Sequence, residues 1–315
     1  MDLLADLFKQ AGLRRRLLDV RQLDASTAFR FPCDKSMGLH VATQGRCHIH
    51  TATLEAPLVL DTGDVALMAR GCHHVLSAES KLGQETKFIA TSWDERLAEQ
   101  ALEQGHSTVI SGAYQLWNAP VHPFLADMPD WFVVRSDSLA RLGPLPLTVA
   151  LLSDEASRSG FGSELIVNGL FDVIFSCLLR EMVERHGASG AGFFHAVADA
   201  QVRRALTLMH EDCAHGWTLE ELASRSGLSR TTLAERFREA MGETPLSYLR
   251  TVRMQCAMRI LSETDKNLEQ VSMEVGYHDA FSFSKAFKRT LGVAPKEFRA
   301  RDQRDKALPW RFGDH

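Results

Sequence analysis

No segment of this 315-residue chain approaches eighteen consecutive apolar residues, so the sequence predicts no membrane span. Residues 1–6 carry two acids where a secretory signal peptide would carry positive charge. The six cysteines are dispersed and form no CxxC pair, which indicates reduced thiols rather than a disulfide framework. We therefore expect a protein of the cytoplasm that has no contact with membranes.

The sequence also lacks the motifs of several large enzyme classes. No Walker loop, dinucleotide-binding glycine pattern or Ser-His-Asp arrangement rises above chance. The hydrophobic share of 45% and the charged share of 24% are ordinary for a globular protein, and the length allows two domains with separate cores. We predict that the protein is not an enzyme.

The net charge of −4 is not that of a typical nucleic-acid-binding protein, but the charge is distributed unevenly. Residues 195–315 hold 19 Lys and Arg against 17 Asp and Glu, whereas residues 1–194 carry a net charge of −6. Residues 281–306 contain eight bases and three acids. Contact with phosphates requires a locally basic face rather than a basic chain, so the C-terminal part is compatible with DNA binding.

Two similar segments follow each other between about Thr218 and Arg299, which indicates a repeated structural unit. Gly227 and Gly276 lie 49 residues apart, and four later pairs lie 50 residues apart: Phe237/Phe287, Gly242/Gly292, Pro245/Pro295 and Tyr248/Phe298. Each segment opens with a predicted capping box, in which two side chains cap the first helical turn: Thr218 with Glu221, and Asn267 with Gln270.

Each unit has the pattern of a helix–turn–helix motif, which reads DNA through its second helix. Ser229 and Asp279 are the predicted N-caps of these second helices. An apolar helix over about 246–261 connects the two units and spans about 24 Å. This length suits two recognition helices about one DNA turn, ~34 Å, apart.

The region from Val202 to Arg301 resembles the DNA-binding module of the AraC/XylS transcription regulators. Matching stretches include residues 217–223, 227–229, 275–277, 283–289 and 292–299. The resemblance implies that base edges and phosphates are contacted by Arg230, Thr231, Thr232, Ala234, Glu235, Arg238, Ala280, Phe281, Ser284, Lys285, Lys288 and Arg289. Glu235 and Lys285 could instead be ordinary solvated positions.

The N-terminal part changes to short alternating segments broken by Gly, Pro and Asp, which predict a β-sandwich or small barrel. The predicted strands cover residues 39–42, 47–53, 58–60, 65–68, 74–77, 87–91, 109–112 and 131–134. Residues 60–74 resemble the second motif of cupins, in which a Gly-Asp turn leads into a strand, a glycine turn and then a histidine. The proline that is frequent at position 69 is replaced by Ala69.

Histidines are concentrated in this N-terminal region. His40, His48, His50 and His74 are the predicted effector-pocket residues, with Phe31 and Trp117 as further lining candidates. Three convergent imidazoles could hold Zn²⁺ or Fe²⁺. However, the His48-Ile49-His50 pair falls after the Gly45 turn rather than before the strand, where the first cupin metal motif lies. We predict ordinary strand or pocket histidines, no metal and no cofactor.

A long apolar helix is predicted over Ser163–His186, followed by a flexible linker at residues 187–192. Part of the helix should cover the N-terminal domain, and the rest could pair with a second copy, although a buried helix without a partner fits the pattern too. The predicted domains are residues 1–150, a cupin-like effector-sensing domain; residues 151–190, a helical dimerisation segment and linker; and residues 196–305, the DNA-binding domain.

The predicted fold class is α+β, with a cupin-like barrel or sandwich, a helical segment and a C-terminal all-α double helix–turn–helix domain. The predicted function is sequence-specific regulation of transcription in response to a small-molecule effector. The expected partners are double-stranded promoter DNA, an unknown effector, a second copy in a homodimer, and RNA polymerase. A metal-dependent cupin enzyme with a helical docking module is the alternative, and a constitutive DNA-binding protein that has lost its ligand is a third.

Overall fold

The computed structural model describes residues 3, 13–31, 36–69, 71–91, 107–116, 128–140, 143–158, 161–186 and 192–307. The chain divides into two compact units. The described part of one unit holds the ten strands, apart from Leu13 of β1 and Leu116 of β9, together with the helices up to Glu181. The described part of the other unit holds residues 3, 13, 116, 182–186 and 192–307. Trp117 and residues 187–191 of the predicted linker lie outside the described residues.

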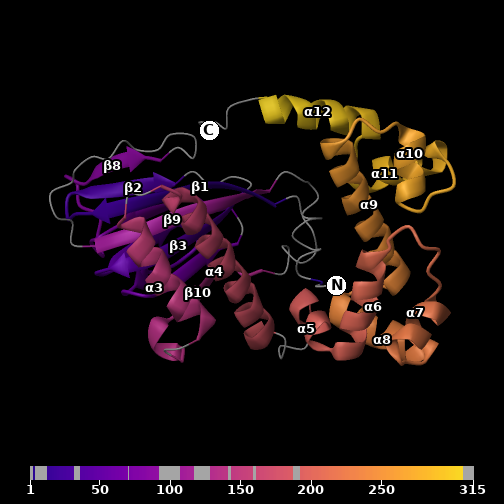
Figure 1. Cartoon of the computed structure of the whole chain (residues 1–315), viewed down its shortest axis with the longest axis horizontal. Coiled ribbons are helices and arrows are strands. Elements are labelled where there is room, and N and C mark those ends of the chain that lie inside the picture. The colour runs from indigo at the N-terminus through magenta and orange to yellow at the C-terminus, as the bar shows by residue number, and fades with distance from the viewer. Residues whose placement is uncertain are drawn as a thin grey trace. The chain divides into compact units, whose positions relative to one another are not determined.

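The first unit is built from two five-stranded sheets (Figure 1). One sheet has the order β1 (Leu13–Leu23), β9 (Ser107–Leu116), β3 (Ser36–Gln44), β6 (Val65–Met68) and β10 (Trp131–Val134). The other has the order β5 (Leu58–Leu60), β4 (Cys47–Thr51), β7 (His74–Ser77), β2 (Thr27–Phe31) and β8 (Lys87–Ala90). The sheets are separate, so the sandwich alternative of the predicted cupin-like domain is the one observed.

The core of this unit lies between the two sheets. Ile49 and Leu76 from one sheet and Ala42 and Met68 from the other belong to a single buried cluster. Because side chains alternate along a strand, the neighbouring Leu39 and Val41 face the opposite side of β3, yet they too are fully buried. The first sheet is therefore covered on both faces.

Two helices, α3 (Pro144–Ala156) and α4 (Ser163–His186), supply this cover (Figure 1). Tyr114 of β9 stacks on Phe175 of α4 with a centroid distance of 4.2 Å, and its hydroxyl donates to Asp172 at 2.7 Å. The predicted helix over residues 163–186 is confirmed, and its inner face packs on the sheet.

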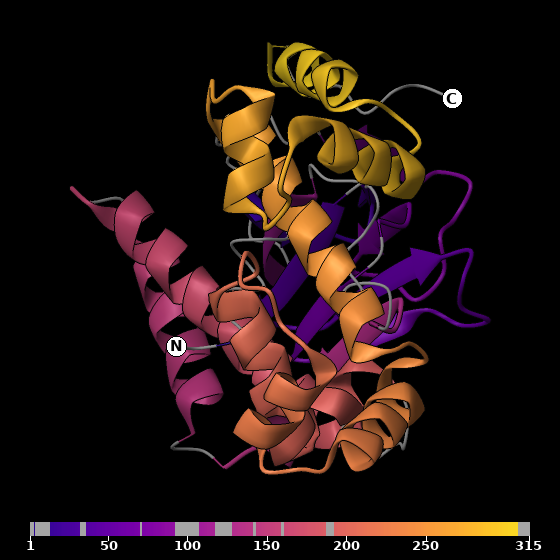
Figure 2. The same cartoon turned by 90° about the vertical axis from the view of Figure 1, so that its right-hand side faces the viewer.

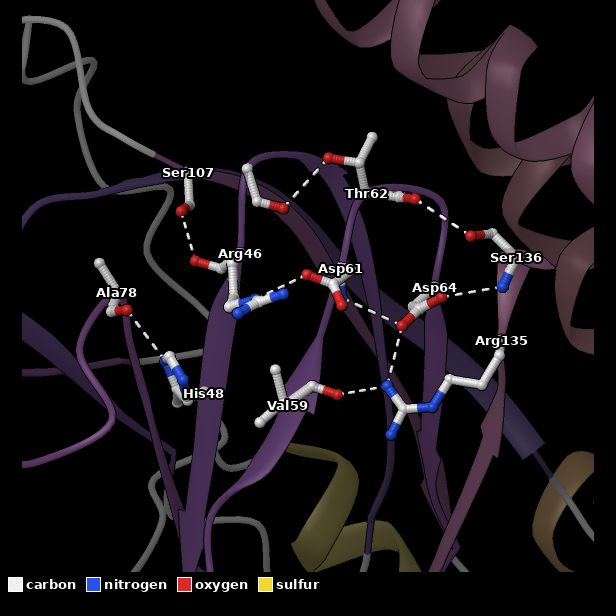
Figure 3. A network of polar contacts seen from close by, with 11 residues as sticks. Arg46, His48, Val59, Asp61, Thr62, Asp64, Ala78, Ser107, Arg135 and Ser136 are labelled. Carbon is white, nitrogen blue, oxygen red and sulfur yellow. Dashed lines mark hydrogen bonds and ion pairs between the residues drawn. The ribbon is translucent and has the colours of Figure 1, made fainter.

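A polar network fixes the Gly-Asp turn that the sequence singled out (Figure 3). Asp64 is 3% exposed, and its carboxylate accepts hydrogen bonds from the Ser136 amide at 2.8 Å, the Asp61 amide at 3.0 Å and Arg135 at 2.8 Å. Gly63 has φ +90°, and a Cβ there would lie 2.9 Å from Ser136 Cβ. The Gly-Asp pair thus anchors the segment after β10, including the short helix η1 (Ser136–Ser138), to the turn.

The second unit is helical. Its elements are α5 (Phe193–Ala198), α6 (Ala200–Glu211), α7 (Leu219–Ser226), α8 (Arg230–Met241), α9 (Pro245–Glu263), α10 (Leu268–Glu274), α11 (Ala280–Leu291) and α12 (Pro295–Ala307). Helices α7 and α8 form the first motif, α10 and α11 form the second, and α9 connects them (Figure 2). No helix among the described residues is long and apolar enough to cross a membrane.

Candidate nucleic-acid interface and effector site

Local capping signals set the start of each recognition helix, α8 and α11. Ser229 Oγ accepts from the Thr232 amide at 3.1 Å, and Asp279 Oδ1 accepts from the Ser282 amide at 2.7 Å. Each helix ends at a glycine in the left-handed conformation, Gly242 or Gly292. The two N-caps, Ser229 and Asp279, are the ones that the sequence predicts.

The two predicted capping boxes have different outcomes. Asn267 and Gln270 form the complete reciprocal pair. Thr218 caps the Glu221 amide at 3.1 Å, but the Glu221 carboxylate accepts from His215 Nε2 at 3.0 Å instead of returning to the cap. The His215 ring stacks edge-on against Trp217, within reach of that carboxylate, so only half of this predicted box forms.

The first recognition helix, α8, packs through Leu233 and Phe237, which are fully buried. Most of the predicted contact side chains on α8 lie outside this buried face; the exposed ones are Arg230, Thr231, Glu235 and Arg238, while Thr232 and Ala234 are half-buried. Two of them already have partners: Arg230 pairs with Glu220 at 2.9 Å, and the Thr232 hydroxyl lies 2.8 Å from Ser229 Oγ.

The second recognition helix, α11, has no acidic residue and packs through Phe283 and Phe287. The opposite side presents the exposed Phe281, Lys285, Lys288 and Arg289, and the half-buried Ala280 and Ser284 lie beside them. Phe281 is 80% exposed, an unusual position for a large apolar ring. A ring of this kind can contact a thymine methyl group in the major groove.

The connector α9 holds both motifs at fixed positions. Tyr248 is fully buried and packs edge-on against Phe237. Its hydroxyl is hydrogen-bonded to His210 Nε2 at 2.9 Å. At the other end of α9, Arg299 of α12 donates to the Leu261 carbonyl at 3.2 Å. The 19 residues of α9 span about 28 Å, which is comparable to the ~34 Å of one DNA turn, and both motifs lie in the same compact unit.

In the first unit, two of the four predicted pocket histidines meet inside the sandwich. His40 Nε2 lies 2.9 Å from His74 Nε2, and both rings are buried. Phe31 stacks on His74 at 4.9 Å, and Trp131 lies edge-on to His74 at 5.1 Å. Burial lowers the pKa of His74 to about 4. The pKa of His40 lies well below its usual value, mainly because the ring is buried and also because His74 and Arg21 are close to it.

The hydrogen bonds of this pair determine its tautomers. The Cys72 carbonyl can only accept, so His74 Nδ1 carries the proton that bonds to it at 3.0 Å. Neutral His74 then accepts at Nε2, so His40 donates from its own Nε2 and accepts at Nδ1 from the Ser111 hydroxyl at 2.9 Å. The result is a directed chain of hydrogen bonds across the two sheets.

His48 and His50 lie elsewhere. Cys47 and Ile49 of the same strand belong to the core, so His48 and His50 face the other side of the second sheet. His48 Nδ1 bonds to the Ala78 carbonyl at 2.9 Å, and His50 Nε2 lies 2.9 Å from Ser77 Oγ. The four histidines therefore do not form one cluster. Within the described ranges, no three His, Cys, Asp or Glu side chains gather as a potential metal site.

Arg21 is the residue of this interior that sequence reasoning missed. It is 2% exposed, and its guanidinium lies 4.8 Å from the Phe29 ring centroid and 5.0 Å from that of Phe31. Arg21 sits in an arginine-rich segment with no strand prediction, and arginine is rarely buried. The sequence therefore carries no local signal for this position.

These features define a two-part protein, with a β-sandwich unit and a helical unit that carries two helix–turn–helix motifs. Residues 2–184 match the family described as Cupin, and residues 222–301 match the family described as Helix-turn-helix domain. The chain is an AraC-type transcriptional regulator whose N-terminal domain belongs to the cupin family.

Several known proteins are similar over much or part of the chain. The HTH-type transcriptional regulator AlkR of Acinetobacter baylyi is 26% identical and covers 95% of this chain and 99% of its own length. The RCS-specific HTH-type transcriptional activator RclR of Escherichia coli is 24% identical over 83% of this chain and 84% of its own. The solved DNA-binding domain of AdpA in complex with a target DNA is 27% identical, covers 35% of this chain and 98% of its own, and has a TM-score of 0.33.

Proposed function

We propose that this regulator reads two successive major grooves of one promoter through the twelve contact residues predicted on α8 and α11. The observation that carries the proposal is the pair of capped recognition helices, each buried on one side and open on the other, on a single connector. Thr231, Glu235, Phe281 and Ser284 have side chains suited to base edges or methyl groups. Lys285, Lys288 and Arg289 suit phosphates.

Selection of duplexes from a random library with the full-length protein tests this reading. The expected product is a site with two half-sites about one DNA turn apart, and mapping of bound chromosomal sites then identifies the regulated genes. Binding that is equal on all sequences, at every salt concentration, would contradict the proposal. Three parts of the prediction are proposed with it: contact with RNA polymerase, location in the cytoplasm, and the domain limits 1–150, 151–190 and 196–305.

The effector is proposed to be a small molecule bound inside the sandwich, next to His40 and His74. The support is the convergence of these two imidazoles with Phe31, Trp131 and the guanidinium of Arg21 in one interior. Aromatic rings with a few polar groups are typical of ligand sites. A screen of candidate metabolites by thermal shift, with His74→Ala as the control that loses the shift, tests this part.

A homodimer is proposed to form through α3 and α4. On α4, Leu165, Ile166 and Val173 are exposed on the side opposite to the face that packs on the sheet, and Leu147 and Leu151 of α3 are exposed as well. An exposed apolar stripe of this kind marks an association surface. Sedimentation of the protein and of a Leu165→Glu variant tests it, because a dimer through this face should dissociate in the variant.

A further inference from the structure

A polar cleft of about 350 Å³ lies between the connector α9 and the second recognition helix α11. Arg250 of α9, Arg289 of α11 and Tyr277 from the turn before α11 line it, with the hydroxyls of Ser247, Thr251 and Thr290. No carboxylate is among its lining side chains. All of these groups can donate hydrogen bonds, so the cleft is suited to an anion with several oxygens.

The two arginines of the cleft are available for a ligand. Both are exposed, and neither forms an ion pair or hydrogen bond within residues 192–307. Arg253, on the same helix, differs because its guanidinium donates to the carbonyls of Cys213 at 2.8 Å and His215 at 2.9 Å. Burial raises the pKa of Tyr277 above its usual value, so its phenol stays protonated and can donate into the cleft.

The position of Arg289 along α11 connects the cleft to the DNA-reading face. Phe281, Lys285 and Arg289 are spaced four residues apart and form one ridge on the exposed side of the helix. Arg289 lies about 12 Å beyond Phe281 along the axis, which is about the width of the major groove. With Phe281 at the base edges, Arg289 reaches the wall of the groove, where the phosphates are.

We propose that this cleft binds one phosphate of the DNA backbone between Arg250 of the connector and Arg289 of the second recognition helix. This inference rests on the proposed two-groove function and adds the connector to the interface. A guanidinium pair holds a phosphate in a defined geometry but reads no base. The cleft therefore sets how α11 enters its groove and contributes affinity on every sequence.

The test uses the full-length protein, a random-sequence duplex and the duplex obtained from library selection. Arg250→Gln and Arg289→Gln are each expected to weaken binding to both duplexes by a similar factor, roughly tenfold. Arg204→Gln, which removes an exposed arginine of α6 outside the cleft, is the matched control and should bind nearly as the parent does. Circular dichroism and melting temperature verify that each variant is folded, and Arg250→Lys, which keeps the charge, should retain the salt dependence.

The double variant distinguishes one shared phosphate from two separate ones. If both arginines hold the same phosphate, the double loss is smaller than the product of the single losses, and the salt slope falls by about 0.9 in total. Losses that multiply, with a slope change of about 1.8, would overturn the shared site. The shared site would also be overturned if the Arg250→Gln variant bound DNA as tightly as the Arg204→Gln control.

A free anion is the other source of the same chemistry, and calorimetry with inorganic pyrophosphate separates the two. Pyrophosphate binding that depends on Arg250, combined with unchanged DNA affinity in Arg250→Gln, would assign the cleft to a free ligand and overturn the proposal. Failure of the parent protein to bind any duplex at low salt would instead refute the proposed function itself.

Discussion

The turns of the two helix–turn–helix motifs each contain one glycine, and substitutions at the two positions can be compared directly. Gly276 and Gly227 occupy equivalent turns, with φ +79° and +72°. A Cβ at Gly276 would lie 2.5 Å from the Ala214 carbonyl oxygen and 2.9 Å from Arg253 Nη2, whereas at Gly227 the nearest atom is 3.9 Å away. Gly227→Ala therefore measures the conformational cost alone, and Gly276→Ala adds a clash with backbone.

The conformational cost of a left-handed alanine is about 1 kcal/mol, and the overlap at Gly276 adds about 2 kcal/mol. For a unit of this size, 1 kcal/mol corresponds to about 4 °C in melting temperature. We expect a loss of about 12 °C for Gly276→Ala and about 4 °C for Gly227→Ala. Calorimetry of the full chain measures both, and equal losses would refute the argument that the Ala214 contact fixes the second motif.

Three further outcomes are expected. Thr231→Arg should change which duplexes are selected, whereas Lys288→Ala should weaken binding to all of them and lower the salt slope by about 0.9; uniform loss from both would contradict the contact assignment. Asp64→Asn should lower the free energy of unfolding by about 2 kcal/mol, measured in urea, because a buried carboxylate loses charged hydrogen bonds. Burial lowers the pKa of His210 to about 3, below its unfolded value near 6.5, so the native state resists protonation. The contribution of His210 to stability should therefore fall by about 1.4 kcal/mol for each pH unit as the pH drops from about 6.5 towards about 3, and His210→Gln should lower the slope of stability against pH by that amount.

The sequence predicted strands well where both ends have turn residues. The strands at Leu58–Leu60, Val65–Met68 and Trp131–Val134 have the predicted bounds. Strands β1 and β2 were not predicted. Strand β1 pairs with β9, and β2 pairs with β7 and β8. These partners lie far along the chain, and no local sequence pattern specifies such pairing.

Local sequence patterns also could not predict which side chains lie in contact in the folded sandwich. His40 and His74 come from different sheets, and a shift of one residue in either strand would turn its side chain to the other face. His48 and His50 alternate along β4 with the core residues Cys47 and Ile49, so they lie on the opposite face of the sheet from the His40–His74 pair. The burial of Arg21 depends in the same way on where β1 pairs.

The double helix–turn–helix unit can be predicted from local sequence, because caps, turn glycines and the buried aromatics of each helix act over only three to five residues. Two arrangements emerge only from the folded chain: a histidine pair and an arginine share the interior of the sandwich, and Arg250 and Arg289 line one cleft. Those arrangements depend on sheet register and on the packing of α9 against α11, which join residues distant in the chain.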